Sequence, residues 1–158
     1  MMMHPTASRA LVLAATIAAI AGQAQAADSD EAFYQRASTC AAAMQFDQLA
    51  LVQRTLAGEQ GLRPQLLDLT KLGFAYVGEA YLKGLRDPRG SDMLKAATAE
   101  QKGWQEGKHK ALVAQCRVEA QKVYDDAGMW QWAVDNKARK RVDRFLSMPA
   151  TPASSASK

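Results

Sequence analysis

The amino-acid sequence predicts an all-α protein, a single-domain bundle of about five helices in which one disulfide ties the first helix to the fourth. Composition is the first indication, because Ala, Leu, Gln, Lys and Glu dominate and β-branched residues are sparse. The second is periodicity, since apolar residues recur at spacings of three and four and no run alternates as a half-buried strand would. The third is the position of the two cysteines, Cys40 and Cys116, on the apolar stripes of two expected helices.

Residues 1–26 have the pattern of a signal peptide. Arg9 is the only charged residue before Asp28, and the apolar run over residues 10–21 is shorter than the roughly 20 residues that span a bilayer. Residues 24–26 read Ala-Gln-Ala, the small-x-small pattern that a signal peptidase accepts. We therefore expect cleavage near Ala26 and a soluble mature protein that is periplasmic or secreted. The alternative is a short hydrophobic helix of the mature fold.

The two cysteines are expected to form a disulfide, Cys40–Cys116. Disulfides persist in oxidising compartments, and an even number of cysteines in a small exported domain favours pairing. A zinc site is disfavoured, because structural zinc takes four ligands, usually from closely spaced cysteines. The bridge would close a loop of about 75 residues and stabilise the fold by up to about 5 kcal/mol. Two free buried thiols are the alternative.

Without its first 26 residues the chain keeps about 130, enough for one domain with one core, which we place at residues 27–147. The formal net charge of +4 falls by one when Arg9 is removed. So mild a bias, in a compartment without nucleic acid, gives no reason to expect a nucleic-acid partner. No later stretch is apolar enough to span a membrane. Residues 148–158 are rich in Pro, Ala and Ser and are expected to form a disordered tail.

The first helix is expected to begin at Ser29 or Asp30, either of which can cap it. Its apolar stripe then changes phase, which predicts a kink or a short second helix near residues 45–47. Gly58 and Gly61 predict the turn that follows. The stripe consists of Phe33, Ala37, Cys40 and Met44.

The second helix is expected to open with Pro64 in its first turn and to be apolar over much of its circumference. It should therefore be the central, most buried helix. Small residues recur along it, including Gly73 and Gly84, although glycine costs about 1 kcal/mol in a helix. We expect this small-residue face to permit close packing of a neighbour. The alternative is a groove for a ligand or for a side chain of a partner.

A loop containing Asp87 and Pro88 is expected to lead to a third helix capped by Ser91, with Gly103 and Gly107 as breaks after it. The fourth helix has a regular apolar stripe that includes Cys116, as the first includes Cys40. We therefore expect the first and fourth helices to be neighbours. The stripe of the fourth helix is Leu112, Cys116, Ala120, Val123 and Ala127.

Gly128 is expected to precede a fifth helix with an apolar stripe and, beside it, a row of cations at i, i+3, i+4 and i+7. Such a row can meet an acidic partner protein or anionic envelope lipid. The alternative is a solvated helix face, partly neutralised by Asp135 and Asp143. The stripe consists of Trp130, Val134, Ala138, Val142 and Phe145, and the cations are Lys137, Lys140, Arg141 and Arg144.

These features favour a non-catalytic binding protein of inhibitor or immunity type, which would block another envelope protein through a protein–protein surface. We expect that surface to join the four cations to an exposed Trp132, which is suited to anchor an interface. No catalytic motif is present and no cofactor is expected. The carboxylates of Glu119 and Asp125–Asp126 are not spaced to converge, and His109 between two lysines is expected to be solvated.

Two other classes of function remain open. A small-ligand or metal carrier would use a cavity between helices, and Phe74, Tyr76 and Tyr81 are the expected lining of its pocket. Neither cysteine belongs to a recognisable metal motif, so no metal site is predicted. An envelope hydrolase is less favoured, because it would need a cleft of clustered carboxylates with perturbed titration.

Overall fold

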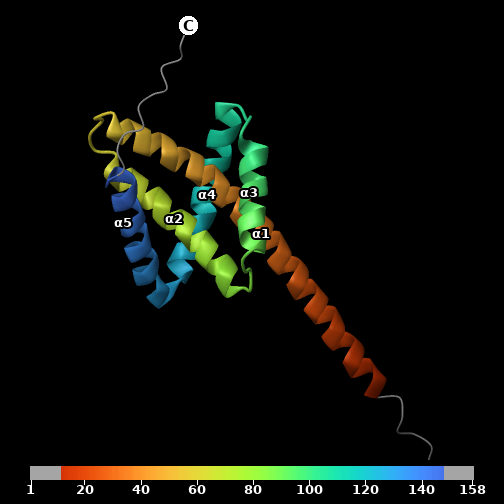
Figure 1. Cartoon of the computed structure of the whole chain (residues 1–158). Coiled ribbons are helices and arrows are strands. Elements are labelled where there is room, and N and C mark those ends of the chain that lie inside the picture. Colours follow the sequence, from red (N-terminus) through yellow and green to blue (C-terminus); the bar gives the residue numbers. More distant parts are fainter. Residues whose placement is uncertain (1–11, 148–158) are drawn as a thin grey trace, which may run out of the picture.

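The computed structural model describes residues 12–147, with side chains from residue 29 onward. This part of the chain is all-α, as predicted: five α-helices and one 3-10 turn, with no strand (Figure 1). None of the described helices combines the length and apolar character needed to cross a bilayer. The first 11 residues of the expected signal peptide and the expected tail lie outside the described residues. The elements are α1 (Val12–Leu56), α2 (Arg63–Leu82), α3 (Arg89–Gln101), α4 (Glu106–Asp126), η1 (Gly128–Trp130) and α5 (Gln131–Ser147).

Helix α1 is continuous, so the predicted start at Ser29 or Asp30 and the predicted short second helix near residues 45–47 are both wrong. Residues 23–57 contain neither glycine nor proline, and a capping residue alone does not end a helix. The apolar stripe does not change phase either, because Met44 and Leu51 are both buried and lie seven residues apart. The first turns of α1 extend beyond the other helices in Figure 1.

Helix α2 is central, as predicted, and packs against α1, α4 and α5. Its proline lies in the first turn, where a missing N–H costs nothing. Gly84, however, lies beyond the end of α2, with a φ of +112° that suits glycine. Of the glycines within the helix, Gly73 faces α1: a Cβ there would lie 3.4 Å from Nε2 of Gln48. Gly78 faces open space, so of the glycines within α2 only Gly73 shows the predicted close packing.

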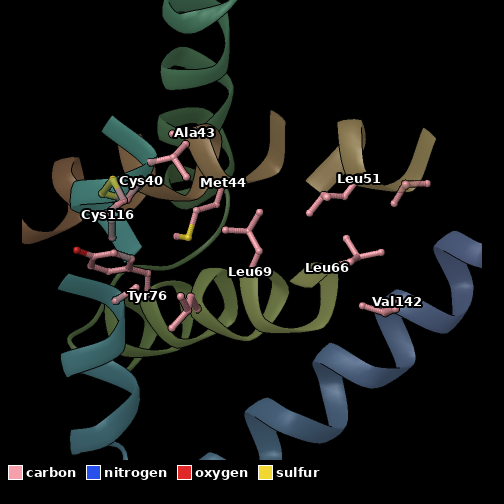
Figure 2. Packing of buried hydrophobic residues seen from close by; sticks show 14 of the residues in the cluster. Cys40, Ala43, Met44, Leu51, Leu66, Leu69, Tyr76, Cys116 and Val142 are labelled. Atoms are coloured by element: carbon pink, nitrogen blue, oxygen red, sulfur yellow. A yellow bond between two sulfur atoms is a disulfide. The ribbon is translucent and has the colours of Figure 1, made fainter. Parts of the chain in front are cut away.

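One hydrophobic core joins α1, α2, α4 and α5 (Figure 2). Met44 of α1, Leu66 and Leu69 of α2 and Val142 of α5 are almost fully buried in it. Each side chain of this size stabilises the fold by about 1.5–3 kcal/mol when it is removed from water. Helix α3 packs mainly on α1 and buries only Ala97 and Gln101.

The predicted disulfide is confirmed. The sulfur atoms of Cys40 and Cys116 are 2.03 Å apart, the Cα atoms are 5.3 Å apart, and both residues are fully buried. The bond joins α1 to α4, so these two helices are neighbours, as expected.

Two details of α3 and α4 differ from the prediction. Pro88 immediately precedes α3, and Ser91 lies inside its first turn, where its hydroxyl donates to Oδ1 of Asp87 at 2.7 Å. Ser91 therefore does not cap the helix. Gly103 does lie in the turn after α3, but Gly107 is the second residue of α4.

Helix α5 buries Ala138, Val142 and Phe145, as its apolar stripe predicted. Trp130 does not belong to this buried stripe, since its exposed fraction is 57%. The reason is local: Trp130 ends the 3-10 turn η1 and lies just before α5 begins. The 3.6-residue period of the helix therefore does not extend to it.

Candidate functional site

The four predicted cations lie together on α5, and we call them the basic ridge: Lys137, Lys140, Arg141 and Arg144. The neighbouring face of α5 is anchored in the core by Ala138, Val142 and Phe145. Lys137, Lys140 and Arg144 are exposed, whereas Arg141 is half-buried with its guanidinium 4.3 Å from the centre of the Phe145 ring. This contact holds one cation of the basic ridge close to the protein surface.

The acidic residues of α5 do not neutralise the basic ridge. The carboxylate of Asp135 lies 3.4 Å from Nζ of Lys71, and that of Asp143 lies 2.6 Å from the guanidinium of Arg63. Asp135 also accepts a hydrogen bond of 2.9 Å from the hydroxyl of Tyr124. Across residues 29–147, no ion pair involves a cation of the basic ridge.

The basic ridge borders a groove of about 440 Å³ between α1, α2, α3 and α5, which we call the basic groove. None of its lining residues is acidic. Two of its polar members are engaged with the protein, since Thr70 donates to the carbonyl of Leu66 at 2.7 Å and Gln48 donates to the carbonyl of Leu69 at 3.3 Å. Apart from the basic ridge, the lining consists of Ala41, Gln45, Gln48, Thr70, Gly73, Phe74, Val77 and Leu94.

A second groove, of about 430 Å³, lies between α2 and the α4–α5 corner, and we call it the apolar groove. Two large aromatic side chains line it while remaining exposed, Tyr81 at 58% and Trp130 at 57%. Phe74, Val77 and Lys137 line both grooves, so the two form one continuous surface. The rest of the lining is Ala75, Gly78, Glu79, Leu82, Val123, Ala127, Ala133 and Val134.

The structure brings together only two of the three residues expected to line a ligand pocket. Phe74 and Tyr81 line the apolar groove, but Tyr76 is 2% exposed and faces the other side of α2. Its hydroxyl donates to Glu119 instead, at 2.8 Å. The spacing explains the difference, because residues five apart on a helix point in very different directions while residues seven apart share a face.

Trp132 does not join the basic ridge as expected. It is 73% exposed, but at 100° per residue it lies about 130° around α5 from the centre of the basic ridge. It lines neither the basic groove nor the apolar groove. The tryptophan that does accompany a cation of the basic ridge is Trp130, which shares the apolar groove with Lys137. Sequence periodicity assigned Trp130 to the core, so this role was missed.

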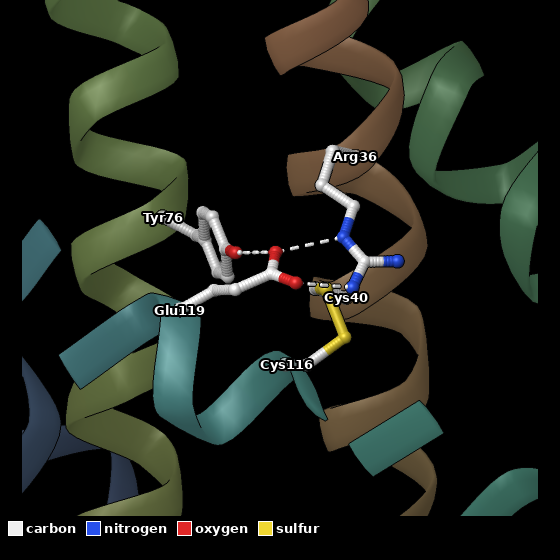
Figure 3. A network of polar contacts seen from close by, with 5 residues as sticks. All are labelled: Arg36, Cys40, Tyr76, Cys116 and Glu119. Carbon is white, nitrogen blue, oxygen red and sulfur yellow. Dashed lines mark hydrogen bonds and ion pairs between the residues drawn. A yellow bond between two sulfur atoms is a disulfide. The ribbon is translucent and has the colours of Figure 1, made fainter. Parts of the chain in front are cut away.

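The carboxylate of Glu119 is held in a structural network beside the disulfide (Figure 3). It accepts hydrogen bonds from Nε and a terminal nitrogen of Arg36, at 2.8 and 2.6 Å, as well as the bond from Tyr76. The Arg36 hydrogen bonds hold the pKa of Glu119 below its usual range. Burial, followed by the hydrogen bond to Glu119, raises the pKa of Tyr76. A carboxylate stabilised in its charged form is poorly suited to act as a general acid or base near neutral pH.

His109 is not solvated as expected. Its side chain is 14% exposed, its ring meets that of Phe46 edge-on at 5.3 Å, and Nδ1 lies 3.5 Å from the carboxylate of Asp47. Both partners belong to α1, on which the first turns of α4 rest. No group of three His, Cys, Asp or Glu side chains in the described part of the chain is arranged to hold a metal ion.

No protein-family model, curated protein or solved structure matches this chain.

Proposed function

We propose that this protein is a non-catalytic binding protein that recognises an acidic surface of a partner protein through the basic ridge. The observation that carries the proposal is the clustering of four cations along a groove without a carboxylate, while the acids on the same helix are paired elsewhere. Like charges held this close repel one another, so a partner that supplies carboxylates gains Coulomb energy and associates faster.

The helix dipole does not account for the cluster. Cations are favoured in the last turn of a helix, where they face the negative end of the dipole. Only Arg144 occupies the last turn of α5, and Lys137 and Lys140 lie further back along the helix. Three of the four cations are therefore left without this local stabilisation, which favours a role in recognition.

We further propose that the protein acts outside the cytoplasm, as an inhibitor- or immunity-type protein of the cell envelope. Two observations support export: the signal-peptide pattern of residues 1–26 and a buried disulfide, which an oxidising compartment preserves. The test is N-terminal sequencing of the protein recovered from the periplasm or the medium. We expect a chain that begins near Ala27. Recovery of the uncleaved chain from the cytoplasm would refute export.

The binding proposal is tested by cross-linking the oxidised protein in envelope extract and identifying partners by mass spectrometry. A ridge variant would carry Lys137→Gln, Lys140→Gln, Arg141→Gln and Arg144→Gln. A matched variant would lose four other exposed lysines: Lys95→Gln, Lys102→Gln, Lys110→Gln and Lys122→Gln.

We expect the original protein and the matched variant to capture one stoichiometric partner, and the ridge variant to capture none. Capture should also weaken as the salt concentration rises, because exposed charges are screened. Equal capture by the ridge variant, or no stoichiometric partner from any form, would refute the proposal.

A second candidate function, a small-ligand carrier, is favoured by the apolar groove, whose volume falls within the usual range for ligand sites. A ligand that binds the folded state raises the melting temperature as its concentration increases. Thermal-shift screening of apolar compounds would test it, with a groove variant that carries Tyr81→Ser and Trp130→Ser for comparison. A rise in the original protein that is lost in the variant is the expected result, and no rise with any compound would exclude this candidate.

A further inference from the structure

We propose that the partner presents an acidic amphipathic helix, whose apolar side chains enter the apolar groove while its carboxylates face the basic ridge. The inference rests on the proposed function and deepens it by naming the element that is recognised. The two grooves meet at Phe74, Val77 and Lys137, so a single segment can occupy both. Lys137 stands at the junction and is the cation that a carboxylate flanking the apolar side chains would meet.

The apolar groove is formed by a second apolar stripe of α2. Its members follow the helical spacing i, i+3, i+7 and i+8 and lie on the face away from the core. Three of them are exposed large hydrophobic side chains, which is unusual for a surface that water alone covers. The stripe consists of Phe74, Val77, Tyr81 and Leu82.

Trp130 faces this stripe from the other wall of the apolar groove. Tryptophan and tyrosine are the side chains that most often contribute the largest part of binding energy at protein interfaces. Covering Tyr81, Leu82 and Trp130 would remove from water the largest exposed apolar side chains of this groove. A helix that brings apolar residues at spacings of three and four matches such a groove between helices.

The length of the basic ridge favours a peptide over a lipid headgroup. The four cations extend from Lys137 to Arg144 of α5, a separation of seven positions or about 10 Å along the helix axis. A single carboxylate or phosphate would reach one or two of them. Acidic residues one turn apart on a helix are separated by about 5.4 Å along its axis and would meet successive cations of the basic ridge. Charge complementarity therefore points to a partner with several carboxylates in a row.

The test is a selection from a displayed library of helical peptides with randomised surface positions. Four forms of the oxidised full chain serve as targets: the original protein, the ridge variant, a groove variant with Tyr81→Ser and Trp130→Ser, and a control variant with Val118→Ser and Trp132→Ser. The control removes two side chains that are at least as exposed as those of the groove variant and that line neither groove. It also tests the expectation that Trp132 anchors the interface.

We expect the original protein and the control variant to enrich peptides with apolar residues at i, i+3 or i+4, and i+7, flanked by Asp or Glu. The ridge variant should lose the acidic enrichment and the groove variant the apolar pattern. The best peptide, measured by fluorescence anisotropy, should bind each of these two variants at least tenfold more weakly than the original protein.

The failures of the two proposals are distinguishable. If the ridge variant selects the same acidic peptides as the original protein, the proposed function fails. If acidic enrichment depends on the basic ridge but the groove variant selects the same peptides, the proposed function survives and the amphipathic helix is refuted. Binding to phosphatidylglycerol vesicles that displaces the best peptide would make anionic lipid the occupant, and no enrichment with any target would refute a helical partner.

Discussion

The side chain of Glu119 connects three helices, because it extends from α4 and accepts hydrogen bonds from Arg36 of α1 and Tyr76 of α2. We predict that Glu119→Gln lowers the free energy of unfolding by about 1 kcal/mol, because it weakens hydrogen bonds to a charged group. The loss would be larger in a buried site, but Glu119 is half-exposed and water screens its charge. The melting temperature should fall by about 4 °C at pH 7, measured by circular dichroism.

The effect of Glu119→Gln should depend on pH. The folded-state pKa of Glu119 is lowered, chiefly by its hydrogen bonds to Arg36, so its contribution is present above the unfolded pKa of about 4.3 and is lost as the pH falls through the folded value. The difference between the variant and the original protein should therefore shrink from pH 7 towards pH 3. Glu59→Gln is the matched control, because Glu59 pairs with Arg54 only five residues away and at the exposed surface. An equal effect of the two substitutions would contradict the prediction.

At the scale of the element, the end of α2 is set by Gly84. Its N–H donates to the carbonyl of Tyr81 and the next N–H donates to that of Ala80, a pairing that requires a left-handed residue. We predict that Gly84→Ala destabilises the protein by about 1–2 kcal/mol, because a Cβ is strained at this φ. Gly78→Ala in the same helix should stabilise it by about 0.5–1 kcal/mol, since open space surrounds Gly78. Urea unfolding would measure both, and shifts of the same sign would contradict this account.

The sequence predicted a structural feature correctly where the residues that determine the feature are close together in the chain. The buried faces of α4 and α5 were predicted from apolar residues at spacings of three and four, because the sequence of an amphipathic helix alone shows which face is buried. The start of α1 did not, since Ser29 and Asp30 resemble caps although nothing before them breaks the helix. His109 was misjudged for a tertiary reason: its neighbours in sequence are lysines, but the residues that cover it belong to α1.

At the scale of the whole molecule, the basic ridge could be predicted from the sequence but the two grooves could not. The four cations share one helix, so their spacing alone places them on one face. The lining of the basic groove comes from four helices, and that of the apolar groove combines α2 with the α4–α5 corner. Trp130 is the clearest case, because its side chain is placed by a 3-10 turn between two helices.

The disulfide constrains a large part of the chain, because it joins residues separated by 76 positions. We predict that Cys40→Ala with Cys116→Ala lowers the free energy of unfolding by about 2–5 kcal/mol, chiefly because the unfolded chain regains the freedom that the bridge removes. Thermal unfolding followed by circular dichroism would measure the loss.

Reduction of the original protein separates the cross-link from the packing of the sulfur atoms. Both cysteines are fully buried, so the double alanine variant also loses buried volume. The reduced original protein keeps that volume and loses only the bond. We therefore expect its melting temperature to lie between those of the oxidised protein and the double variant, and much closer to the latter. If reduction left the melting temperature unchanged, core packing alone would hold α1 against α4, and the bridge would contribute nothing to stability.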